Sequence, residues 1–103
     1  MAPGINWSMA TLTPAQVATE ITATPGWQVS DERLTRTVTR KDFRDALLFV
    51  NAVGFLAERA AHHPDILIAW NAVTLTLITH SAGGLTDKDF VLAREISGLL
   101  SAS

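Results

Sequence analysis

Residues 42–86 read DFRDALLFVNAVGFLAERAAHHPDILIAWNAVTLTLITHSAGGLT, and the spacing of their apolar residues changes partway along the stretch. In 42–62 the apolar residues recur at every third or fourth position, which predicts a long amphipathic helix. Beyond Pro64 apolar and polar residues alternate, which predicts two strands over 66–70 and 73–80. We expect Pro64 to end the helix, because a proline disfavours the helical conformation in the preceding residue.

The predicted helix over 42–62 has a broad apolar surface, which we expect to pack against other elements of the fold. Because Leu47 belongs to this surface, we expect Leu47→Asp to unfold the domain. The apolar positions are Phe43, Ala46, Leu47, Val50, Val53, Phe55, Leu56 and Ala60.

The strand predicted over 73–80 is followed by signals for a turn and a second long helix. Gly83-Gly84 is typical of a turn. Thr86 then caps the helix, with Asp89 at the third helical position, where a carboxylate can accept a hydrogen bond from the capping backbone. The apolar side of this helix consists of Phe90, Ala93, Ile96 and Leu100.

Upstream of residue 42 the pattern predicts a helix and two further strands. Thr13-Pro14-Ala15-Gln16 combines a capping box with proline in the first turn, so a helix is expected to begin there and to end at Pro25-Gly26. Strands are predicted over 27–29 and 34–40, where threonine and valine favour extended backbone. Their connection lacks glycine, so we expect a loose loop rather than a two-residue hairpin turn.

These elements follow one another in the order α-β-β-α-β-β-α. A four-stranded antiparallel sheet with three helices packed on one face accounts for this order, and the predicted fold class is α+β. We expect a single domain over residues 12–103, because a chain of 103 residues supplies one modest core. Residues 1–11 have no clear period and are expected to form a partly ordered N-terminal extension.

The composition excludes several classes of function. The net charge is −2 without a basic stripe, which argues against direct binding of nucleic acid. The absence of cysteine excludes disulfides, zinc–thiolate sites and thiol catalysis. No apolar stretch reaches the roughly 18 residues of a membrane span, and the first ten residues lack the pattern of a secretion signal, so we expect a cytoplasmic protein. With 48% hydrophobic residues, some apolar surface is expected to be covered by other subunits.

The three histidines of the chain are the leading candidates for chemistry. His62 and His63 are adjacent, and His80 follows at the end of a predicted strand. Histidine exchanges protons near neutral pH, so this grouping suggests proton transfer. Glu58 precedes His62 by four residues, close enough on a helix to hydrogen-bond its ring or hold its charge. The alternative is a helix C-terminus that carries histidine only because its carbonyls favour positive charge.

Other interpretations compete for the same residues. Metal binding by the adjacent histidines is disfavoured, because their side chains diverge and no His-Glu-x-x-His motif is present. His80 alone could be a solvent-exposed histidine at a strand end. Trp70 is more typical of a core or an interface, although an aromatic face can also stack a flat heterocycle. Asp89 has a structural explanation as a capping residue.

Taken together, these residues resemble the signature of the pterin-4a-carbinolamine dehydratases (4a-hydroxytetrahydrobiopterin dehydratases). The resemblance rests on Glu58-x-x-x-His62-His63-Pro64, the aromatic Trp70, His80 and Asp89, and it extends over roughly residues 12–100. One departure is Thr37-Val38-Thr39, where the family often has phenylalanines. The resemblance implies the same α+β fold that the hydrophobic pattern predicts.

The resemblance also implies a reaction, which is loss of water from 4a-hydroxytetrahydropterin to give quinonoid dihydropterin in tetrahydrobiopterin recycling. It implies acid–base work by His62 and His80, with His63 counted among the catalytic residues and orienting the pterin. Neither a metal nor an organic cofactor is implied, because the pterin is the substrate. The implied supporting or substrate-binding residues are Glu58, Pro64, Trp70 and Asp89.

The partners are implied in the same way. Homodimers or homotetramers are expected, in which edge strands pair across subunits. An aromatic amino acid hydroxylase is the expected pathway partner, since its product would be the substrate. The alternative is a non-catalytic binding module, a dimerisation cofactor or assembly factor for another protein. Such a module has no physical need for the three histidines.

Overall fold

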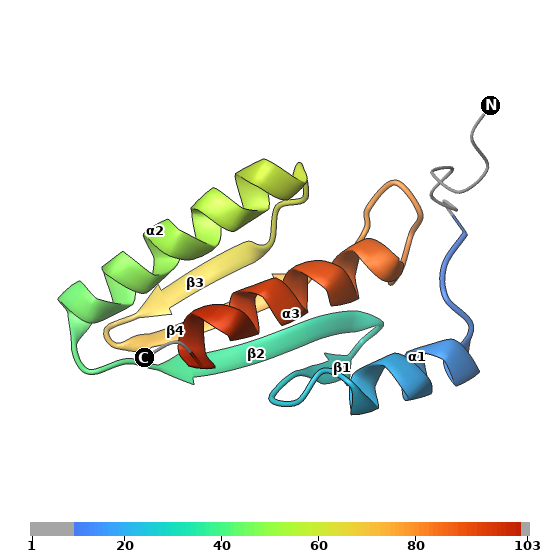
Figure 1. The fold of residues 1–103 in the computed structure, drawn as a ribbon, viewed down its shortest axis with the longest axis horizontal. Helices are drawn as coiled ribbons and strands as arrows, with labels where there is room; N and C mark the ends of the chain where they lie inside the picture. The colour runs from blue at the N-terminus through green and yellow to red at the C-terminus, as the bar shows by residue number, and fades with distance from the viewer. Residues whose placement is uncertain (1–9, 102–103) are drawn as a thin grey trace.

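The computed structural model describes residues 10–101, which contain the predicted elements in the predicted order (Figure 1). The four strands form one sheet in the order β1-β2-β4-β3, and each neighbouring pair is antiparallel. The predicted α+β fold is therefore confirmed. The elements are α1 (Pro14–Thr22), β1 (Gln28–Ser30), β2 (Arg33–Thr39), α2 (Phe43–Ala60), β3 (Asp65–Ala69), β4 (Ala72–Leu77) and α3 (Asp87–Ser101).

The alternating pattern of the two central strands gives the sheet one buried and one exposed face. In the register of β2 and β4, Leu34 lies opposite Leu77 on the apolar side. On the other side Thr37 lies opposite Thr74, and their hydroxyls are 3.0 Å apart. The helices cover the apolar face, where burial of aliphatic and aromatic side chains provides the main stabilisation. The fully buried core side chains from α2, β2, β4 and α3 include Leu34, Val53, Val73, Leu75, Leu77, Phe90 and Ile96.

The connection between β1 and β2 differs from the predicted loose loop. Ser30 pairs with Arg33, so only Asp31 and Glu32 form the turn. Both have positive φ angles, 53° and 60°, as a two-residue turn between twisted strands requires. The prediction failed because it required glycine at these positions, whereas aspartate also tolerates the left-handed region.

Helix α2 ends earlier than predicted, and proline does not terminate it directly. Ala61 adopts a left-handed conformation with φ 53°, and its N–H donates to the carbonyls of Ala57 and Glu58. The N–H of His62 donates to the Ala57 carbonyl at 3.1 Å. This backbone closure satisfies the last carbonyls of the helix. His62 therefore lies beyond α2, not in its last turn.

Fewer apolar residues of α2 are buried than the sequence pattern predicts. Ala46, Phe49, Val53 and Ala57 are buried, whereas Leu47 is 40% exposed. The prediction that Leu47→Asp unfolds the domain is therefore not supported, because the side chain already contacts water. Other large apolar residues of α2 are also exposed, namely Phe43, Leu48 and Phe55.

Candidate active site

The most buried polar contact at the predicted site joins His62 to Asp89. The distance between His62 Nε2 and Asp89 Oδ1 is 2.6 Å, and the two side chains are 11% and 0% exposed. A charge-assisted hydrogen bond of this length in a region of low dielectric is strong and directional. Since a carboxylate oxygen accepts, Nε2 of His62 donates. The other ring nitrogen, Nδ1, is then left to accept or deliver a proton.

Asp89 is held in place by hydrogen bonds to its second oxygen. Oδ2 accepts from the Thr79 hydroxyl at 2.8 Å and from the backbone N–H of Thr86 at 2.9 Å. The hydroxyls of Thr79 and Thr86 are themselves 2.8 Å apart. The predicted capping role of Asp89 is therefore confirmed, and the same carboxylate also orients His62. One side chain thus links the start of α3 to the segment that follows α2.

The local folding of each element explains why these groups meet. Asp89 lies in the first turn of α3, where the helix N-terminus favours negative charge. Thr79 lies just beyond β4 and pairs with Gly84 in an isolated bridge, which points its side chain inward beside the core. The early end of α2 turns His62 back toward the same carboxylate. Three separate segments are thereby fixed around one buried acid.

His63 forms a second histidine–carboxylate pair, which is exposed. The distance between His63 Nε2 and Glu58 Oε2 is 2.8 Å, and the side chains are 65% and 80% exposed. Glu58 therefore hydrogen-bonds His63 rather than His62, the partner that the helical spacing predicts. The partner of Glu58 is thus one residue further along the chain than predicted. The reason is that the chain leaves the helical conformation at Ala61, so the four-residue spacing of a helix does not apply beyond it. An exposed pair of this kind contributes little to stability but can steer the ring.

His80 begins the turn that follows Thr79, and its side chain is exposed. The strand predicted over 73–80 ends at Leu77, so His80 is three residues beyond β4. Within residues 10–101 the His80 ring has no hydrogen-bond partner, although its backbone carbonyl accepts from Gly83 at 3.1 Å. The backbone thus places His80 next to Thr79, and through Thr79 near the buried acid.

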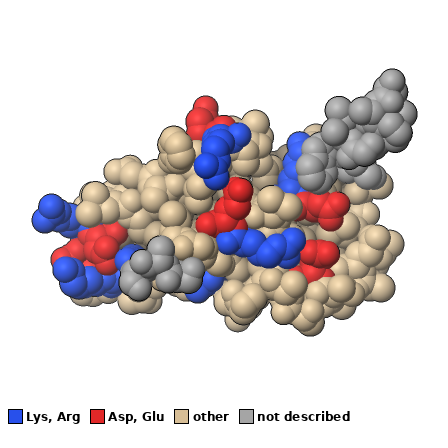
Figure 2. Space-filling view, in the orientation of Figure 1, with Lys and Arg blue, Asp and Glu red and all other residues tan. Residues whose placement is uncertain are grey.

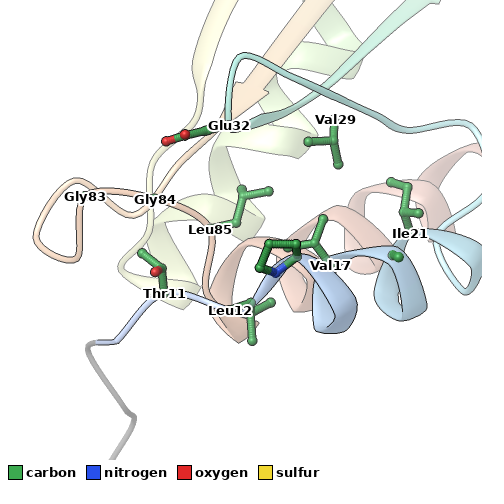
Figure 3. Close-up of a pocket in the computed structure, with 11 residues that line it drawn as sticks. Thr11, Leu12, Val17, Ile21, Val29, Glu32, Gly83, Gly84 and Leu85 are labelled. Carbon is green, nitrogen blue, oxygen red and sulfur yellow. The ribbon is translucent and has the colours of Figure 1, made fainter.

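A cavity of about 280 Å³ lies beside His62 between α2 and α3. A larger cavity of about 650 Å³ lies between α1 and the segment 83–85, and no histidine lines it (Figure 3). The smaller cavity is the better candidate for proton chemistry, because a paired imidazole opens onto it. Its lining residues are Arg59, Ala60, His62, Lys88, Val91, Leu92 and Glu95.

Trp70 and Pro64 lie at opposite ends of β3. Pro64 connects His63 to the strand, whereas Trp70 occupies the turn between β3 and β4 and is 68% exposed. Figure 1 shows the segment that leaves α2 at one end of β3 and the β3–β4 turn at the other end. Within one chain, therefore, the structure does not bring Trp70 beside the histidines.

Thr79 is the site residue that sequence reasoning missed. Its signal was present, because a hydroxyl interrupts the apolar side of a strand after Leu75 and Leu77. A buried hydroxyl requires a hydrogen-bond partner, and here the partner is Asp89.

Figure 2 shows acidic and basic side chains in small mixed groups on an otherwise uncharged face. In the part of the chain that the structure describes, no three histidine or acidic side chains come together as a metal site. Over the same residues, no helix is long and apolar enough to cross a membrane.

A buried acid that orients a histidine beside a cavity, on a helix-covered antiparallel sheet, is compatible with acid–base chemistry. Comparison with known proteins specifies the class. The model of the pterin 4 alpha carbinolamine dehydratase family matches residues 10–99, and the chain belongs to this family of hydro-lyases. The predicted resemblance is thereby confirmed.

Individual relatives agree with this assignment. A protein of Thermomicrobium roseum is 48% identical over 93 residues, which cover 90% of this chain and 100% of the relative. A protein of Nocardia farcinica is 49% identical over 88 residues, which cover 85% of this chain and 93% of the relative. Both are named "Putative pterin-4-alpha-carbinolamine dehydratase".

A solved structure from Brucella melitensis has the same fold, with a TM-score of 0.83 and 36% sequence identity. The match covers 86% of this chain and 97% of the other. That protein is described as a transcriptional coactivator/pterin dehydratase.

Proposed function

We propose that the chain dehydrates 4a-hydroxytetrahydropterin to quinonoid dihydropterin. The observation that carries the proposal is the buried Asp89–His62 pair beside a cavity, on the fold of a dehydratase family. In the reaction the C4a–O bond breaks, and the hydroxyl leaves as water after it gains a proton. The proton on N5 is lost, and the N5 electron pair forms the new double bond to C4a. The reaction therefore needs one proton donor and one proton acceptor.

The histidines of this chain supply both groups. His62, with Nε2 engaged by Asp89, uses Nδ1 for proton transfer, and Asp89 stabilises the imidazolium form of the ring. His80, exposed and next to Thr79, makes the second proton transfer. His63, steered by Glu58, binds and orients the pterin, with Pro64 fixing the backbone beside it. No cofactor takes part, because the electrons move within the substrate.

The proposal extends to the cellular role. A dehydratase of this type returns the product of an aromatic amino acid hydroxylase to the tetrahydrobiopterin pool. We place the chain in this recycling step, in the cytoplasm, as a homodimer or homotetramer. The exposed apolar side chains of α2 support self-association, because burying them in a subunit interface would remove apolar surface from water.

The test is the rate of dehydration, followed by the absorbance change as 4a-hydroxytetrahydropterin is converted. Wild-type protein is expected to accelerate the reaction well above buffer. His62→Ala and His80→Ala should each lower turnover by about 10²–10⁴-fold, as for loss of a positioned acid or base. Arg44→Ala, on an exposed helical position, is the control for substitution alone. Wild-type turnover in both histidine variants would show that His62 and His80 are not the proton-transfer groups.

A second function, as a binding module, is favoured by the exposed apolar face of α2 and by the coactivator description of the Brucella structure. In this case the domain would present α2 to a protein partner with a complementary apolar surface. The dehydration assay separates the two functions. A wild-type rate equal to that of buffer would favour the binding module.

A further inference from the structure

The hydroxyl of Thr79 lies in the middle of a buried chain of hydrogen bonds. Thr79 is 3% exposed and Thr86 is 4% exposed, and their side-chain oxygens are 2.8 Å apart. The Thr79 oxygen is also 2.8 Å from Asp89 Oδ2, and the backbone N–H of Lys88 donates to the Thr86 oxygen at 3.3 Å. On the far side of Asp89, His62 Nε2 lies 2.6 Å from Oδ1. The chain of contacts therefore ends on an imidazole.

Only one arrangement of hydrogens keeps all of these contacts as hydrogen bonds. A backbone N–H such as that of Lys88 can only donate, and the carboxylate of Asp89 can only accept. Each threonine hydroxyl has a single hydrogen, so the hydrogen of Thr79 points to Asp89 and that of Thr86 points to Thr79. If Thr79 turned to donate to Thr86, the buried carboxylate would lose a donor, which is costly. The chain therefore runs in one direction, from the first turn of α3 to Asp89.

The backbone of Thr79 anchors the turn that carries His80. The Thr79 carbonyl accepts from the N–H groups of Ala82 and Gly83, both at 3.0 Å. The Thr79 N–H donates to the Gly84 carbonyl at 3.1 Å. Because His80 follows Thr79 directly and lies inside this closed turn, the backbone position of Thr79 sets the position of His80.

Thr79 is thus connected to both proposed proton-transfer groups, through different parts of one residue. Its hydroxyl reaches His62 through Asp89, and its peptide groups hold the turn of His80. The hydroxyl is not needed to cap α3, because the Thr86 N–H already donates to Asp89 Oδ2 at 2.9 Å. A fully bonded buried network of this kind holds its members in one geometry. Proton transfer to and from one substrate requires such a fixed relation between donor and acceptor.

We infer that Thr79 is a positioning residue, whose hydroxyl holds the Asp89 carboxylate against His62 and so fixes the ring of His62 relative to His80. Without this donor the carboxylate can rotate about its Cβ–Cγ bond, and Nδ1 of His62 no longer has one direction. The kinetic part of the inference rests on the proposed dehydration. The part that concerns the His62 ring does not, because the hydrogen bonds are present without substrate.

The variants Thr79→Val and Thr79→Ser separate the hydroxyl from the shape of the side chain. Valine keeps the shape and removes the hydroxyl, whereas serine keeps the hydroxyl and loses a methyl group. Both leave the backbone groups of the His80 turn in place. Thr79→Val should lower kcat by about 10–100-fold, with KM changed by less than about threefold, as expected when a proton-transfer group is misplaced. Thr79→Ser should restore kcat to within about threefold of wild type.

Thr24→Val is the matched control for loss of a buried threonine hydroxyl. Thr24 is 1% exposed, and its hydroxyl donates to the Glu20 carbonyl at 2.7 Å and accepts from Arg94 at 2.9 Å. These contacts join the end of α1 to α3, and none of them involves a residue of the Thr79 chain. Thr24→Val should therefore lower Tm and leave kcat unchanged. Wild-type kcat in Thr79→Val, or an equal loss of kcat in Thr24→Val, overturns the inference.

The ring of His62 gives a second readout that needs no catalysis. The proton in the short bond to Asp89 should give a downfield ¹H resonance that is lost in His62→Ala. Thr79→Val should shift or broaden this resonance, and Thr79→Ser should retain it. If circular dichroism shows Thr79→Val unfolded, Thr79→Ala takes its place with the same expectations. If wild-type protein shows no dehydration, the proposed function fails, and an unchanged resonance in Thr79→Val would then overturn the positioning role separately.

Discussion

Asp89→Asn changes one oxygen to an amide group and should change the proton position on His62. The asparagine oxygen can still accept from Thr79 and from the Thr86 N–H. Its amide then faces His62 Nε2 as a donor, at a position where the wild-type carboxylate accepts at 2.6 Å. His62 must therefore accept with Nε2, which moves the ring proton to Nδ1. Nδ1 is then in the wrong state for accepting a proton.

The size of the effect follows from burial. The variant exchanges a charge-assisted hydrogen bond at a fully buried side chain for a neutral one, which lowers the free energy of unfolding by about 1 kcal/mol. For a domain of this length, that corresponds to a fall in Tm of about 5 °C. Turnover should fall by about 10²–10⁴-fold, as when a positioned proton-transfer group is lost.

The assay combines urea unfolding followed by circular dichroism with the dehydration rate. Imidazole ¹⁵N chemical shifts report which ring nitrogen of His62 carries the proton. Asp87→Asn is the matched control, since Asp87 is acidic and in the same helical turn but exposed. Its unfolding free energy should change by less than about 0.5 kcal/mol. If Asp89→Asn behaves like this control in stability, turnover and ring protonation, Asp89 does not orient His62.

Three further predictions concern stability. Gly54→Ala should raise the unfolding free energy by about 0.5–1 kcal/mol in thermal or urea unfolding, because alanine is the better helix former and a Cβ at this site meets nothing within 4 Å. A decrease would show that the space beside Gly54 is not free. Val53→Asp should abolish the cooperative unfolding transition, because Val53 is fully buried, whereas Leu47→Asp should retain it. The same outcome for both variants would contradict the assignment of Val53 to the buried face of α2 and of Leu47 to the exposed face. The Lys41 backbone N–H holds the pKa of Asp45 below its ordinary value, and Arg40 adds to the effect. Asp45 therefore stabilises the fold at pH values above its pKa in the unfolded chain. This contribution is lost as the pH falls through the lower pKa of the folded state. Urea titrations below about pH 4 should therefore show a smaller acid loss of stability for Asp45→Asn than for wild type.

Much of the fold was predictable because each segment has a period that only one structure satisfies. The alternation of Val73, Leu75 and Leu77 with threonine requires a half-buried strand, and the buried residues of β4 are these three. The family resemblance was predictable for a similar reason, since several spaced residues had to agree at once.

The errors concern places where tertiary contacts override local pattern. No local rule required Ala61 to adopt a left-handed conformation. As a consequence of this conformation, Glu58 binds His63 instead of His62, and His62 binds Asp89. The exposure of Leu47 could not be predicted either, because helical periodicity does not show how wide the covered face is. Residues 1–9, which include most of the expected N-terminal extension, lie outside the described residues.

In the proposed reaction, His62, His63 and His80 act together on one pterin. The most direct measurement is a crystal structure with a bound pterin such as 7,8-dihydrobiopterin. We expect the pterin ring to lie within hydrogen-bonding distance of the His62 Nδ1 atom, with His63 and His80 at its edges. A pterin bound in the apolar cavity beside α1, with all three imidazoles out of reach, would contradict it.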